Sequence, residues 1–122
     1  MTGSELVARL VADGEIDAPH RALNVTVWSN GPRDTYGAHA HGFDKALVAV
    51  RGSIAFELPD TDTARHLRAG DRLDLPAGTR HAATVGPDGV DCVEVHLPRG
   101  TLAATDVRAS WLDAETGRTR RA

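Results

Sequence analysis

The sequence has little of several features on which whole classes of protein depend. Cys92 is its only cysteine, so the chain can form no internal disulfide, which is typical of a reducing compartment. No apolar run approaches the roughly 18 residues that are needed to cross a bilayer. The amino terminus carries Glu5 and Asp13, whereas a secretion signal has a basic start before an apolar core. We therefore expect a cytoplasmic protein that has no membrane as a partner.

An excess of basic charge is also missing. The chain has 14 lysines and arginines against 17 acidic residues, and its net charge is -3 at pH 7. Because nucleic-acid-binding domains usually carry a basic stripe, no nucleic acid is expected as a partner. Hydrophobic residues make up 41% of the chain and charged residues 25%, which is ordinary for a globular protein. The 122 residues have room for one core.

The chain divides into three unequal parts. We predict an N-terminal helical segment over 1–18, a barrel over 19–98, and a C-terminal helix with a flexible tail over 99–122. In the first part, Thr2 and Glu5 have capping-box spacing, and the apolar residues of 6–11 fall on one face of a helix. In the last part, the apolar spacing of 103–111 predicts a short helical stripe before the arginine-rich end.

The middle part is rich in predicted strands. The apolar stretch 46–58 is interrupted at 51–53 by Arg-Gly-Ser, which predicts a tight turn between two strands. The sequence Gly-Pro-Asp-Gly at 86–89 predicts a second turn, which joins strands at 81–85 and 90–97. Many short strands with closely spaced turns favour an all-β fold, either an antiparallel sandwich or a barrel.

Two histidines carry the first sign of chemistry. His39 and His41 are two residues apart on a predicted strand, so their imidazoles project from the same face. Two converging neutral imidazoles are a common beginning of a transition-metal site. Taken alone, the pair is equally consistent with two exposed histidines that bind nothing.

The spacing around this pair resembles the two motifs of the cupin superfamily. Residues 39–52, HAHGFDKALVAVRG, match most of the first motif, G-x5-H-x-H-x3-4-E-x6-G. Residues 70–85, GDRLDLPAGTRHAATV, match the second, G-x5-P-x-G-x2-H-x3-N. Four anchors of the second motif are in register: Gly70, Pro76, Gly78 and His81.

The resemblance implies a cupin jelly-roll, a double-stranded β-helix barrel, here with short terminal helices and a metal ion in its mouth. His39, His41 and His81 map onto the three histidine ligands of the family. The ion implied is one divalent transition metal (zinc, iron, nickel or copper), since magnesium and calcium prefer oxygen ligands. Three neutral ligands leave the charge of the ion uncompensated and leave positions open, which favours an anionic or chelating substrate.

The chain departs from the family pattern at three positions. The leading glycine of the first motif is not at its usual distance, Val85 stands at the closing asparagine, and Lys45 stands at the metal-binding glutamate. A lysine inside a barrel needs a partner. Cys92, Glu94 and His96 share one face of the last strand by alternation, so Glu94 can pair with Lys45 if that face points inward. Otherwise Glu94 or His96 reaches the metal, Lys45 points to solvent, or the metal has been lost.

Two classes of function follow from the resemblance. The first is a metal-dependent enzyme that acts on a small anionic or chelating substrate as a dioxygenase, isomerase, lyase or cyclase, with Lys45, Glu94 and Tyr36 as candidate catalytic residues. The second is a non-catalytic module that binds a small molecule or a metal. Because apolar edge strands are commonly paired, we also expect a homodimer.

Overall fold

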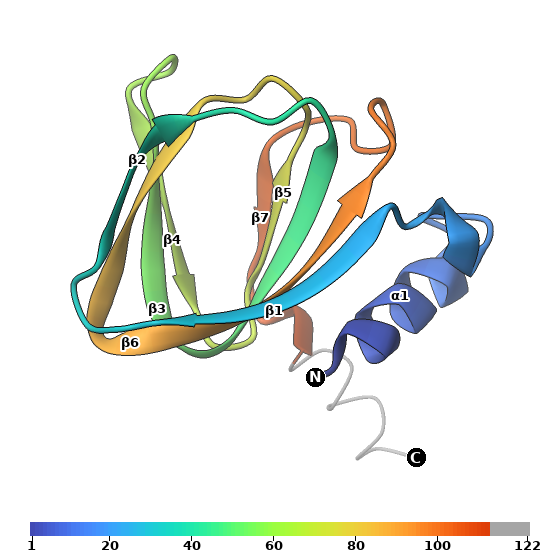
Figure 1. Ribbon diagram of the computed structural model, residues 1–122, viewed down its shortest axis with the longest axis horizontal. Helices are drawn as coiled ribbons and strands as arrows, with labels where there is room; N and C mark the ends of the chain where they lie inside the picture. Colours follow the sequence, from blue (N-terminus) through green and yellow to red (C-terminus); the bar gives the residue numbers. More distant parts are fainter. Residues whose placement is uncertain (113–122) are drawn as a thin grey trace.

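Strands wrap around an interior to form a barrel, and one helix lies against its outside (Figure 1). The computed structural model describes residues 1–112, and within them seven strands form one sheet. The strands follow the order β1-β6-β3-β5-β7, with β2 paired to β6 and β4 paired to β3. The elements are α1 (Gly3–Ala12), a short 3-10 helix η1 (Pro19–Arg21), β1 (Asn24–Asn30), β2 (Thr35–His39), β3 (Asp44–Leu58), β4 (Thr63–Arg68), β5 (Arg72–Leu75), β6 (His81–Leu97) and β7 (Asp106–Arg108).

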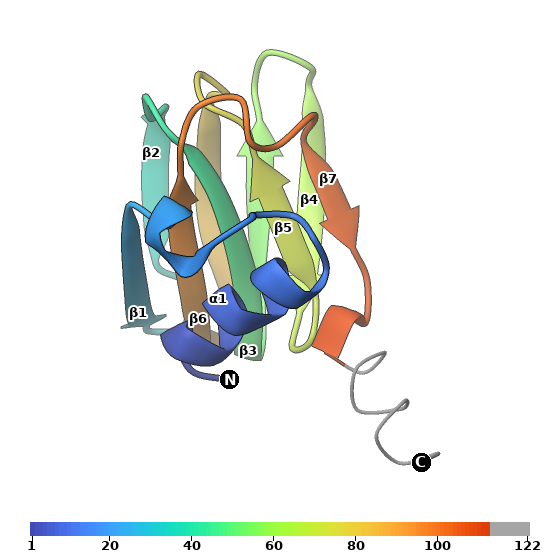
Figure 2. The ribbon, with the colours of Figure 1, turned by 90° about the vertical axis from the view of Figure 1, so that its right-hand side faces the viewer.

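The predicted N-terminal helix and its cap are confirmed. The Thr2 hydroxyl accepts a hydrogen bond from the Glu5 amide, and the Glu5 carboxylate accepts one from the Thr2 amide. Leu6 and Leu10 are fully buried on the side of α1 that faces the sheet. Figure 2 shows α1 lying across the outer face of the sheet, where it packs against β6 and β1.

The strand β3 contributes to two separate cores. Leu47 and Ala49 belong to the core inside the barrel. Ala46 and Val48, which alternate with them, belong to a second core between the barrel and α1. Successive side chains of a strand point to opposite faces, so a strand with both faces covered is continuously apolar. The helix therefore explains the unbroken apolar run in this part of the sequence.

The two turns predicted inside the barrel are wrong. β3 runs unbroken through the Arg-Gly-Ser sequence, and β6 runs unbroken through 86–89. The pairing register shifts here instead: Gly52 pairs with Val90, and the next pair is Ile54 with Val85. Gly52 has φ +77°, and a Cβ there would clash with the backbone of the opposite strand. Glycines and bulges at this place bend the sheet into a barrel without reversing the chain.

The helical stripe predicted over 103–111 is also wrong in its central part. Asp106–Arg108 forms the strand β7, which pairs with β5 along an edge that would otherwise be open. Trp111 is helical and buried, and the Arg9 guanidinium lies 3.7 Å from the centre of its ring. The flexible tail predicted at the end of the segment 99–122 lies outside the described residues. Within residues 1–112, no helix is long and apolar enough to span a membrane.

A buried arginine joins the segment after α1 to the barrel. Arg72 on β5 is fully buried, and its guanidinium donates to both carboxylate oxygens of Glu15 at 2.7 and 2.8 Å. It also donates to Asp74 at 2.8 Å. A paired guanidinium of this kind fixes orientation through its planar fork, so the network holds the α1 connection in register with β5.

Candidate metal centre

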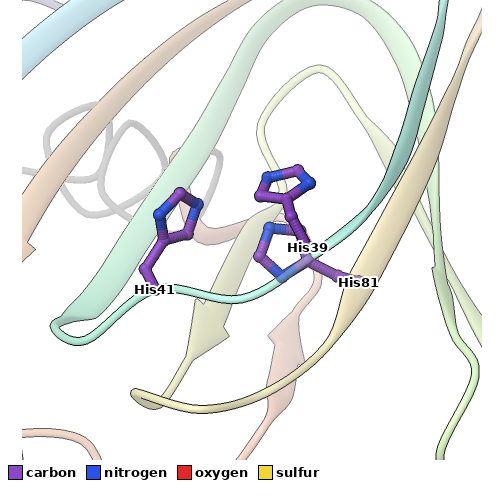
Figure 3. A group of neighbouring side chains, drawn as sticks. All are labelled: His39, His41 and His81. Atoms are coloured by element: carbon purple, nitrogen blue, oxygen red, sulfur yellow. The ribbon is translucent and has the colours of Figure 1, made fainter.

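Three histidines meet at one end of the barrel (Figure 3). His39 is the last residue of β2, and its Cα pairs with that of His81, the first residue of β6. His41 lies two residues past His39, in the loop between β2 and β3. One ligand nitrogen from each ring can be chosen so that the three lie within 4.8 Å of one another. The strand alternation predicted for His39 and His41 does not apply, because β2 ends at His39, yet the rings do converge.

Backbone carbonyls orient two of the three rings. The Nδ1 atom of His39 lies 2.8 Å from the carbonyl oxygen of Gly37, and that of His81 lies 3.0 Å from the carbonyl oxygen of Thr79. A carbonyl oxygen only accepts, so Nδ1 carries the proton in both rings and donates it. Each Nε2 then presents a lone pair, and this is the usual arrangement behind histidines that bind metals.

The surroundings also hold the imidazoles of His41 and His81 neutral. Burial, the Lys45 ammonium and the other two histidines lower the pKa of His41 to about 4. Burial also lowers the pKa of His81, and His39 and Lys45 make smaller contributions in the same direction. Only a neutral imidazole has a lone pair to share, so both rings are in the ligand form at neutral pH.

Lys45 points into the barrel. β3 begins at Asp44, one residue before it, so the late strand start that would turn Lys45 to solvent is not found. The Lys45 ammonium lies 3.6 Å from a carboxylate oxygen of Glu94 and 3.4 Å from Nε2 of His41. The exposed fractions of the Lys45 and Glu94 side chains are 12% and 8%. The inward face of β6 therefore carries Glu94, as alternation from Cys92 predicts.

Glu94 is fully engaged by neighbours. Trp28 donates its indole N–H to one carboxylate oxygen at 2.6 Å, and Nε2 of His96 lies 2.6 Å from the other. Burial opposes ionisation, but Lys45 and these two hydrogen bonds outweigh it and keep the pKa of Glu94 below its usual value. Among residues 1–112, the one group of possible ligand side chains is the three histidines, without Glu94 or His96. Trp28 was not identified as a partner of Glu94 from the sequence, because nothing local links the two positions.

A cavity of about 240 Å³ opens beside His39 and His81. Tyr36 lies at its edge, 37% exposed, with its ring 6.4 Å from that of Trp28 in an edge-to-face arrangement. Burial and the nearby Asp34 carboxylate raise the pKa of Tyr36, so its phenol stays protonated at neutral pH. Of the three candidate catalytic residues, Tyr36 lines this cavity, whereas Lys45 and Glu94 lie outside its lining.

Solved structures resemble this barrel. A variant of the oxalate decarboxylase of Bacillus subtilis matches with a TM-score of 0.57 and 16% identity over 68% of this chain and 22% of its own length. A Klebsiella pneumoniae protein with a double-stranded β-helix domain matches with a TM-score of 0.54 and 23% identity, over 69% of this chain and 66% of its own. A Neisseria meningitidis protein matches with a TM-score of 0.53 and 26% identity, over 60% of this chain and 71% of its own. The fold of this chain is therefore that of a small cupin-like domain. Neither the protein-family models nor the curated protein sequences gave a match.

The donor set of the cupin-like domain suits a transition metal. The potential ligands are three imidazole nitrogens, and two of the rings are already oriented by backbone carbonyls. The ammonium of Lys45 stands near this group, but the carboxylate of Glu94 balances its charge. His41 offers Nε2 to Lys45, so an ion bound by that nitrogen would replace this hydrogen bond.

Two other polar residues of the cupin-like domain, Cys92 and Asp44, are buried and have structural roles. Cys92 is fully buried, and burial together with the charges of Glu94 and Asp91 raises the pKa of its thiol to about 12, so it stays protonated. Asp44 is buried and accepts hydrogen bonds from the amides of Ala77 and Leu102. Its carboxylate holds two loops together and does not face the three histidines.

Proposed function

We propose that this cupin-like domain binds one divalent transition metal ion on His39, His41 and His81. The observation that carries the proposal is the convergence of three imidazoles, two of them with Nδ1 committed to a backbone carbonyl. Nitrogen donors favour zinc, iron, nickel or copper over magnesium and calcium. Three protein ligands are typical of catalytic sites, which keep a position for water or substrate.

We further propose that the loaded domain is an enzyme for a small anionic or chelating organic substrate, of dioxygenase, isomerase, lyase or cyclase type. A bound ion would supply Lewis-acid or oxygen-activating chemistry. Tyr36 is the protein's own proton donor at the cavity, because its phenol stays protonated and partly exposed. Lys45 and Glu94 act behind the cavity as positioning residues, since each neutralises the other and Lys45 contacts His41.

A non-catalytic module that binds a small molecule or a metal is the second candidate. It is favoured by the lining of the cavity, where Tyr36 is the one described side chain with a transferable proton apart from the histidines. The second candidate is also favoured by Lys45, which stands where the first motif has a glutamate. The chain therefore has no carboxylate at this position to act as a general base beside the histidines.

A homodimer is the assembly that we propose. β1 lies at one end of the strand order, so one of its edges has no partner among residues 1–112. Leu23, Val25 and Val27 are exposed along it, and 23–30 carries no charge. An apolar edge strand without charges is normally covered by another chain or segment.

Metal analysis tests the metal proposal. Protein purified without chelator and supplied with zinc, iron, nickel or copper is expected to hold about one ion per chain. His39→Ala is the first variant, because His39 is exposed and its loss should leave the barrel folded. His66→Ala, which removes an exposed histidine of β4, is the matched control and should keep the ion. Failure of the parent to take up any of the four metals would overturn the proposal, as would full occupancy in a His39→Ala/His81→Gln double variant.

A further inference from the structure

The cavity beside the histidines has walls made chiefly of carbon. Its lining includes two of the proposed ligands, His39 and His81. The ring of Phe56 lies 6.2 Å from that of His81, so an aromatic face continues directly from the metal site. The apolar part of the wall also includes Trp28, Ile54 and Ala83.

Charge is absent from the lining described here. Among residues 1–112, no aspartate, glutamate, lysine or arginine lines the cavity. The nearest interior charges, those of Lys45 and Glu94, are paired with each other, and the indole N–H of Trp28 is also bonded to Glu94. A small dianion would therefore find no second cation beyond the metal, and its hydration would be lost against apolar walls.

Two polar residues besides the histidines, Asn30 and Tyr36, line the cavity. Tyr36 is partly exposed. A ligand thus meets the nitrogen donors of the histidines, a wall that is mostly carbon, and one amide and one phenol. This combination of surfaces fits a molecule with one polar head and an apolar body.

The volume of the cavity is sufficient for a ring-sized body. A buried apolar cavity of about 150 Å³ is large enough to hold benzene. The cavity here measures about 240 Å³, so it has room for one ring and a short head group.

The geometry points to a substrate that joins one ring-sized apolar body directly to a pair of chelating oxygens. The pair of oxygens would face His39 and His81, and the body would lie against Trp28, Ile54 and Phe56. This inference rests on the proposed metal site, and it narrows the substrate from any small chelator to one with a single compact apolar group.

Two hydroxamic acids test the inference. Acetohydroxamic and benzohydroxamic acid have the same metal-binding head, and they differ in carrying a methyl group or a phenyl ring. Calorimetric titration of the zinc-loaded protein is expected to give at least about tenfold tighter binding of benzohydroxamic acid, because the ring leaves water for an apolar wall. Equal affinities in the parent protein would overturn the inference, whether or not any variant folds.

Two alanines of β6 supply matched variants. Ala83 lines the cavity, so Ala83→Leu should fill the space for the ring and abolish the preference for benzohydroxamic acid. Ala82 is its neighbour on the opposite face of the strand, so Ala82→Leu should keep the preference. Metal content is measured in each sample. A protein that holds zinc but loses no preference in Ala83→Leu contradicts the inference alone, whereas a parent that takes up no metal overturns the proposed function and the inference with it.

Discussion

Substitution of Lys45 by methionine removes one charge of a buried pair and leaves the other inside the barrel. The ammonium and the carboxylate of Glu94 are 3.6 Å apart, and both side chains are largely hidden from solvent. Methionine keeps most of the apolar stem of lysine, so the change in packing is small. The substitution therefore reports mainly on the uncompensated carboxylate.

The expected magnitude follows from what Glu94 retains. Breaking a buried ion pair by removing one partner costs about 3–5 kcal/mol in free energy of unfolding. Glu94 keeps its hydrogen bonds with Trp28 and His96, each 2.6 Å long, so the lower end of that range applies. For a domain of this size, a loss of about 3 kcal/mol corresponds to a fall in Tm of roughly 12 °C.

Urea unfolding of the metal-free protein at pH 7 measures this loss. Arg51→Met is the control, because Arg51 forms a shorter ion pair with Asp91, at 2.7 Å, but at the surface. Exposed pairs are weak, so the control should lose clearly less stability than Lys45→Met. Lys45→Met/Glu94→Gln should recover most of the loss, because no buried charge is left unpaired. If Lys45→Met is no more destabilising than Arg51→Met, the inward pair does not exist in solution and the account of Lys45 fails.

Three further predictions concern pH, assembly and the helix cap. The free energy of unfolding of the metal-free protein should fall as pH is lowered from 6.5 to about 4: burial and Lys45 lower the folded-state pKa of His41 to about 4, so the unfolded chain binds more protons in this window. His41→Gln should flatten this dependence in a pH series of urea titrations, and a flat parent profile would contradict it. Sedimentation velocity at micromolar concentration should show a species of twice the 13.0 kDa chain mass, and a 13.0 kDa species alone would exclude the homodimer. Thr2→Ala should lower the free energy of unfolding by about 1 kcal/mol through loss of the cap, while Ser4→Ala from the same turn should not; equal effects would argue against the capping box.

Local features of the sequence were sufficient to predict the N-terminal helix and to match the two motifs. The capping box of Thr2 and Glu5 involves residues three apart, and a helical turn brings such residues together whatever surrounds them. Gly70, Gly78 and His81 could likewise be matched by spacing alone, because each serves a turn or strand start close by. Gly70 and Gly78 both have positive φ.

Turn-forming residues led to wrong predictions where the local structure depended on which strands pair. Glycine at 52 and the sequence at 86–89 allow a chain reversal, but they equally allow a bend in a long strand. Which of these occurs depends on whether β3 and β6 stay paired on both sides of the bend. The same holds for β7, whose residues joined the sheet because the edge of β5 was open.

The sequence, through its resemblance to the two cupin motifs, implied which three imidazoles come together, and the structure brings His39, His41 and His81 within reach of one another. Only the tertiary structure decided the direction of Lys45 and its partner. In the register of β3 and β6, the Cα atom of Lys45 lies opposite that of His96. This register brings the Lys45 ammonium to the carboxylate of Glu94 on the same inward face. That contact joins residues far apart in the chain, and its energy depends on burial, which no local pattern of residues specifies.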